Sequence, residues 1–145
     1  MFGDLLKRLT QSDPEPLGDT DARLAIAAVM VRIARSDGDY ADVEIDQIDR
    51  IIGSRFGLAP AEAMTLRAEA ETLETEAPDT VRFTRAIKNA VPYEDRRAVV
   101  EAAWSVALAD GGRAVEENAL MRLVASLLGV RDIDSARARQ RAGRR

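Results

Sequence analysis

The stretch LAIAAVMV, residues 24–31, contains no charged or polar side chain. Its alanines, leucine and methionine favour a helix, and a helix that is apolar on all sides is normally the buried centre of a domain. The predicted helix begins at Asp19 or Thr20, both good N-cap residues, and runs to about Arg35. Gly38 suits the left-handed conformation that ends such a helix. We therefore expect the rest of the domain to pack around this segment.

The remaining sequence also indicates helices, because alanine is abundant and few stretches alternate with period two. Gly and Pro residues separate the predicted helices, which span about 42–55, 60–76, 80–90, 92–109, 114–128 and 132–142. A short helix with an apolar stripe precedes a linker rich in Pro and Gly, and both lie within residues 1–18. The predicted fold class is all-α.

The composition excludes several kinds of chemistry. A chain of 145 residues with 46% hydrophobic and 32% charged residues is one ordinary domain. It has no histidine and no cysteine, which excludes disulfides, zinc sites of the usual kind, thiol nucleophiles and Ser-His-Asp triads. The net charge of −4 argues against a nucleic-acid partner. No apolar run approaches the roughly 20 residues that span a bilayer, and we expect a cytoplasmic protein.

A weak internal repeat places an Asp-Gly turn after each of the two most apolar helices. Asp37 and Gly38 form the first turn, and Asp110 and Gly111 form the second. In both copies a glutamate, Glu44 or Glu117, lies seven residues after the aspartate. We expect the two helix–Asp-Gly–helix hairpins to pack as a pseudo-symmetric pair with both turns on one side.

The acidic residues have two interpretations. In the simpler one, Asp39 or Asp42 caps the following helix, while Asp46 and Asp49 form its solvated face. In the other, crowded carboxylates bind calcium, magnesium or manganese, which accept oxygen ligands alone. The spacing is not that of an EF-hand, because Ile48 stands where the bidentate glutamate belongs. The candidate metal ligands are Asp37, Asp39, Asp42, Glu44, Asp110, Glu116 and Glu117.

Two segments resemble a known family. RSDGDYADVE at residues 35–44 and ADGGRAVEE at residues 109–117 look like the two signatures of the tellurite-resistance TerB-like proteins. The N-terminal domain of the co-chaperone DjlA is similar to the same fold. The resemblance implies a single compact bundle of about seven helices, a cluster of acids that binds metal, and a link to metal-stress systems that work with membrane proteins. It matches the family's acids to Asp37, Glu44, Asp110 and Glu117, whereas Gly112 and Arg113 stand where more acid is common.

The resemblance also suggests how the chain is organised. Residues 1–18 would be the short helix and linker, 19–130 the TerB-like helical domain, and 131–145 a C-terminal helix with an arginine-rich tail. We expect the tail to be a solvated end. Its arginines are Arg137, Arg139, Arg141, Arg144 and Arg145.

The favoured function is a non-catalytic stress-response module that binds a divalent metal through both acidic loops and uses no organic cofactor. The alternative is a protein-interaction, scaffold or co-chaperone-like module near the inner membrane, with a basic partner on its acidic face. In that case the tail would bind an acidic partner or anionic lipid. Without histidine the chain lacks the His-Pro-Asp tripeptide of a J-domain.

An enzyme that uses paired carboxylates, such as a glycoside hydrolase, is disfavoured because the sequence offers few aromatic platforms for a sugar. The single tryptophan, Trp104, lies within an apolar stripe and is expected in the core. Glu101, one turn earlier, is expected to pair with an arginine such as Arg32, although a buried acid with a raised pKa is the other reading.

Overall fold

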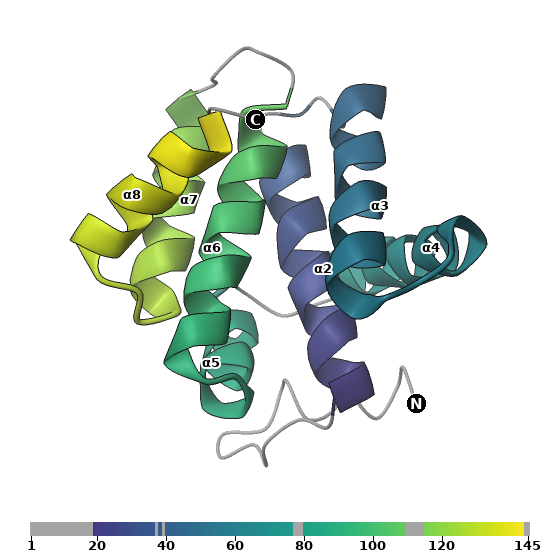
Figure 1. The fold of residues 1–145 in the computed structure, drawn as a ribbon, viewed down its shortest axis with the longest axis horizontal. Helices are drawn as coiled ribbons and strands as arrows, with labels where there is room; N and C mark the ends of the chain where they lie inside the picture. The colour runs from purple at the N-terminus through teal and green to yellow at the C-terminus, as the bar shows by residue number, and fades with distance from the viewer. Residues whose placement is uncertain (1–18, 37, 39, 77–79, 110–114, 144–145) are drawn as a thin grey trace.

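The computed structural model describes residues 19–36, 38, 40–76, 80–109 and 115–143 (Figure 1). These residues form an all-α bundle without a β-strand, which confirms the predicted fold class. The short helix predicted within residues 1–18 lies outside the described residues. The helices are α2 (Asp19–Arg35), α3 (Asp42–Phe56), α4 (Pro60–Glu76), α5 (Thr80–Ala90), α6 (Tyr93–Ala107), α7 (Val115–Leu127) and α8 (Asp132–Gly143).

Helix α2 is the centre of the bundle. Every side chain from 24 to 31 is buried, as the apolar run predicted. The helix contacts α3, α4, α5, α6 and α7, so partners cover it along most of its surface. Figure 1 shows α2 and α6 next to each other in the middle, with α3 on one side and α7 and α8 on the other.

Helix α6 supplies the second apolar surface. Trp104 is 4% exposed and belongs to the core, as expected. The helix ends at Ala107, two residues before the predicted end. The reason is local, because the Ala109 N–H bonds to the carbonyl of Val106 at 3.1 Å, which tightens the last turn to the 3₁₀ pattern.

The two connections that follow α2 and α6 start and finish at the same end of the bundle. Figure 1 shows that α2 and α6 end there and that α3 and α7 begin there. Gly38, in the first connection, has a φ of +82°, the left-handed conformation that the sequence predicted.

Helix α8 packs on α6 and α7, and its Ala138 and Ala142 belong to the core cluster. At its start, the Tyr93 hydroxyl donates a 2.7 Å hydrogen bond to the buried carboxylate of Asp134. This hydrogen bond, together with the nearby Arg131 guanidinium, lowers the pKa of Asp134 from its ordinary value. The start of α8 is therefore tied to the start of α6.

The prediction of a solvated arginine tail is wrong for two of its residues. Arg139 stacks on the Trp104 ring, with its Cζ 4.9 Å from the ring centroid. Arg141 forms an ion pair with Glu101 of α6. Small buried alanines let α8 approach α6 closely enough for both contacts. Arg144 and Arg145 lie outside the described residues.

Across the described ranges, we find no helix with the length and apolarity that crossing a membrane requires.

The packing of α4 against α2 can be tested with two variants of the same helix. Leu73 is fully buried, whereas Met64 is 53% exposed. We expect Leu73→Ala to lower the free energy of unfolding by about 2–5 kcal/mol, because it leaves a cavity. Met64→Ala should change it by less than about 0.5 kcal/mol. Urea denaturation of both variants measures the difference, and equal effects would contradict the described packing.

Candidate functional site

The structure describes two of the seven predicted metal ligands with their side chains, Asp42 and Glu44. Glu116 and Glu117 lie in the first turn of α7, but their side chains are outside the described part of the chain. The other three predicted ligands, Asp37, Asp39 and Asp110, are outside the described residues altogether. The predicted site is therefore described only at the α3 side.

Glu44 has an unusual position for a carboxylate. It is fully buried, in the first turn of α3. Its Oε1 accepts a hydrogen bond from the N–H of Ala41 at 3.3 Å, which satisfies one of the amide groups that a helix N-terminus leaves without a helical partner. Glu44 thus caps the first turn of α3 with a buried side chain, at the end of the bundle where α6 also ends.

The capping role predicted for Asp42 is wrong. The N-cap residue of α3 is Ala41, and Asp42 is the first residue of the helix, with an exposed side chain. Asp42 and Glu44 still lie at the positive end of the helix dipole, where carboxylates are favoured. The cap predicted for Asp39 falls on a residue outside the described ranges.

The solvated face predicted for α3 is correct for Asp46 and wrong for Asp49. Asp46 is exposed. Asp49 accepts a 2.8 Å hydrogen bond from the Nε of Arg67 on α4, and both side chains are largely buried. Arg67 also reaches Glu71 at 3.1 Å, so one guanidinium binds two carboxylates and joins α3 to α4.

Tyr40 joins the connection between α2 and α3 to the same charged group. Its hydroxyl donates a 2.7 Å hydrogen bond to Glu71 Oε2. Arg35 stacks on its ring at 4.9 Å and pairs with Glu74 at 2.7 Å. Burial and the hydrogen bond to Glu71 raise the pKa of Tyr40 above its ordinary value. Tyr40, two residues before α3, is thus held on α4 by its neutral phenol.

The described side chains do not include three or more acidic residues grouped closely enough to hold a metal ion. Asp49 of α3 and Glu71 and Glu74 of α4 are engaged with arginines or Tyr40. They belong to the structural network that joins α4 to α2 and α3, so the metal prediction depends on the seven ligands named from the sequence.

The residues considered for catalysis have structural surroundings. Trp104 lies in the core, and its Nε1 donates to Ser135 Oγ at 3.2 Å. Glu101 pairs with an arginine, as expected, but the partner is Arg141, while Arg32 pairs with Glu74 at 3.2 Å. Trp104 and Glu101 therefore both have structural roles in the described part of the chain.

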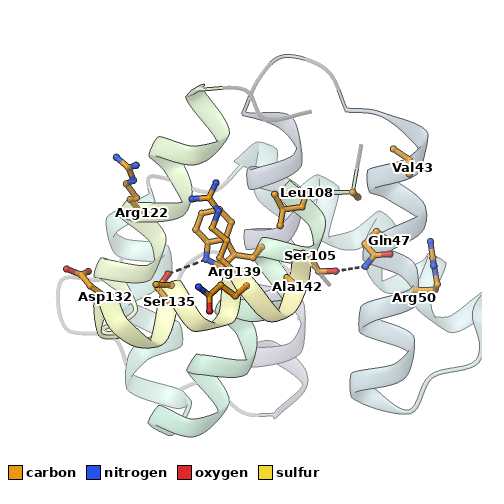
Figure 2. Close-up of a pocket in the computed structure, with 15 residues that line it drawn as sticks. Val43, Gln47, Arg50, Ser105, Leu108, Arg122, Asp132, Ser135, Arg139 and Ala142 are labelled. Carbon is orange, nitrogen blue, oxygen red and sulfur yellow. Dashed lines mark hydrogen bonds between the residues drawn. The ribbon is translucent and has the colours of Figure 1, made fainter. Parts of the chain in front are cut away.

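A groove that the sequence analysis missed lies between α3 and α8, over the C-terminal half of α6. Figure 2 shows Val43, Gln47 and Arg50 of α3 on one side and Ser135 and Arg139 of α8 on the other. Its volume is about 1250 Å³. The spacing of Val43, Gln47 and Arg50 at i, i+4 and i+7 marks one face of α3, but only the position of α8 shows that this face is left open.

Three comparisons place the chain among known proteins. A family model described as "Tellurite resistance protein TerB" matches residues 23–140. None of the curated proteins matches the sequence. The crystal structure of a protein of unknown function from Porphyromonas gingivalis W83 is similar, with a TM-score of 0.63 and 18% identity over 90% of this chain and 96% of that one. At this identity the likeness concerns the fold.

The contact between Tyr40 and Glu71 can be tested with Tyr40→Phe. We expect this variant to lower the free energy of unfolding by about 1–3 kcal/mol, because it removes a hydrogen bond to a charged group. Since folding raises the pKa of Tyr40, the native protein should also lose stability as the pH rises past about 10, the ordinary tyrosine value. Tyr40→Phe should lack that part of the alkaline loss.

Urea denaturation at neutral and alkaline pH measures both effects. Tyr93 is present in both proteins, so its contribution cancels in the comparison. An unchanged alkaline loss in Tyr40→Phe would contradict the assignment.

Proposed function

The chain belongs to the tellurite resistance protein TerB family, and from this premise we propose that it is a non-catalytic stress-response module that binds a divalent cation between its two acidic loops. Calcium, magnesium and manganese are the cations that such an all-oxygen donor set fits. The proposed ligands are Asp37, Asp39, Asp42, Glu44, Asp110, Glu116 and Glu117. The absence of cysteine from the sequence is consistent with action in the cytoplasm.

The observation that carries this proposal is the position of Glu44. Its carboxylate is fully buried at the end of the bundle where α2 and α6 end and α3 and α7 begin. Carboxylate oxygens are ligands that calcium, magnesium and manganese bind. The hydrogen bond from Ala41 fixes one oxygen of the group. An ordered carboxylate at this end is the donor that a hard cation requires.

The positions of the two aspartates in the sequence also support a site that both loops share. Asp37 follows the last residue of α2 by two positions, and Asp110 follows the last residue of α6 by three. Both helices end on the same side of the bundle. The proposed site therefore draws on the two connections together, and Glu44 and Glu117 contribute from the first turns of the helices that follow.

We propose a non-catalytic module because the residues weighed for catalysis have structural roles. Glu101 is paired with Arg141, and the Trp104 ring, the one tryptophan that could stack on a sugar, is only 4% exposed. The chain has no histidine or cysteine to supply a nucleophile or a base.

Metal binding can be measured by calorimetric titration and by thermal melting with calcium, magnesium and manganese. We expect a binding heat with at least one of them at up to about millimolar concentration, and a higher melting temperature, because a ligand that binds only the folded state stabilises it. Asp37→Asn and Asp110→Asn should each abolish or strongly weaken both signals if the two loops share one site.

Asp46→Asn is the matched control, because it removes the same charge from an exposed position of α3 that is not a proposed ligand. It should bind metal like the native protein. The absence of both heat and a melting shift with all three metals would refute the metal proposal. Loss of binding in Asp37→Asn but not in Asp110→Asn would refute the shared site.

A further inference from the structure

The groove between α3 and α8 is an open surface with its own charge pattern. Helix α3 packs on α2, α4 and α6, while α8 packs on α6 and α7. Helix α6 therefore forms the floor between them (Figure 2). A second stretch of about 850 Å³ continues along α3 and α6 and shares Gln47, Arg50 and Ser105 with the first. The depression thus extends over several turns of helix.

Three guanidiniums surround the first stretch, and they come from different helices. Arg50 lies on α3, Arg122 on α7 and Arg139 on α8. Among the residues that the structure describes, none of these three has a carboxylate within ion-pair distance. Among the described lining residues, the one carboxylate is that of Asp132. Arginine does not lose its proton in proteins, so the groove keeps a positive excess in a chain whose net charge is −4.

Apolar side chains can cover the floor of the groove at little cost in free energy. Gln47 donates to Ser105 Oγ at 2.5 Å, which bridges α3 and α6. Trp104 Nε1 donates to Ser135 Oγ at 3.2 Å, which bridges α6 and α8. These polar groups already have partners, so covering them costs little. Beside them lie Leu108 and Val43, the latter 42% exposed.

We propose that this groove binds an acidic amphipathic segment of another protein. The carboxylates of the segment would pair with Arg50, Arg122 and Arg139, and its apolar face would cover Val43 and Leu108. Two helical walls on either side of a floor that includes the apolar Leu108 are a setting in which an amphipathic helix is bound. Arg139 is held in place by its stacking on Trp104, so less side-chain freedom is lost when it pairs with a carboxylate.

The shape of the surface favours a protein segment over a membrane. The arginines lie around a concave surface on three helices, and a flat lipid surface would reach the rims without touching Leu108 or Ser105 on the floor. The described residues that line the groove include none of the proposed metal ligands, and the inference rests on the arginines, so it does not depend on the metal proposal.

A synthetic amphipathic peptide, about three heptads long with leucine on one face and glutamate on the other, is a direct probe. Trp104, the single tryptophan, lines the groove, so its fluorescence reports occupancy, and calorimetry gives the affinity. We expect the peptide to bind, and to bind more weakly at high salt. The same peptide with lysine in place of glutamate should not bind. A version with serine in place of leucine should bind more weakly.

The double variant Arg50→Glu/Arg122→Glu tests the location, because both side chains are exposed and their replacement leaves the core intact. It should lower the affinity by about tenfold or more. Arg139→Gln is a second variant that removes one charge at the Trp104 stack. Arg85→Glu is the control, since Arg85 is exposed on α5 and does not line the groove; this variant should bind like the native protein.

Three results would overturn the proposal. The first is no binding of the glutamate peptide to the native protein. The second is equal binding to the double variant and to the native protein. The third is binding to phosphatidylglycerol vesicles without binding to the peptide, which would assign the arginines to a membrane surface.

Discussion

The complete burial of α2 is the constraint on which the rest of the structure depends. Residues 24–31 offer no face to water, so several helices must cover them, and α3 through α7 do so. Helix α8 packs instead on the outer surface of α6, where its small side chains Ala138 and Ala142 allow a close approach. Because α8 covers only part of α6, the strip of α6 between α8 and α3 becomes the floor of a groove.

The helices could be predicted because their causes are local. Apolar periodicity and the positions of proline act within a few residues, and α4 and α5 begin and end where these signals place them. The end of α6 was predicted two residues too late, because a 3₁₀ hydrogen bond between Ala109 and Val106 cannot be recognised from the residue types. The central position of α2 was also predictable, because a helix that is apolar on all sides is stable only in the interior of the bundle.

The partners of the charged side chains could not be predicted in this way. Asp49 pairs with Arg67, and Glu101 with Arg141 forty residues further along the chain. Such pairs depend on how the helices are placed relative to one another, which hydrophobic periodicity does not specify. For the same reason, the acidic loops could be recognised in the sequence, because each is one continuous stretch of residues. The arginines of the groove could not, because they come from three separate helices, α3, α7 and α8. The ligand set at the loops stays a prediction.

Helix α3 shows why the net charge of a chain is a poor guide to its partners. Its acidic composition suggested one solvated negative face, but successive positions on a helix point about 100° apart. Ile48 and Ile52 therefore enter the core, Asp49 turns to Arg67 of α4, and Gln47 and Arg50 line the groove. The acids on the α4 side are largely neutralised within the bundle, whereas the groove arginines lack carboxylate partners in the described part of the chain. Because surface fields decay within about 10 Å in salt, a segment in the groove experiences the local positive charge more strongly than the distant negative excess.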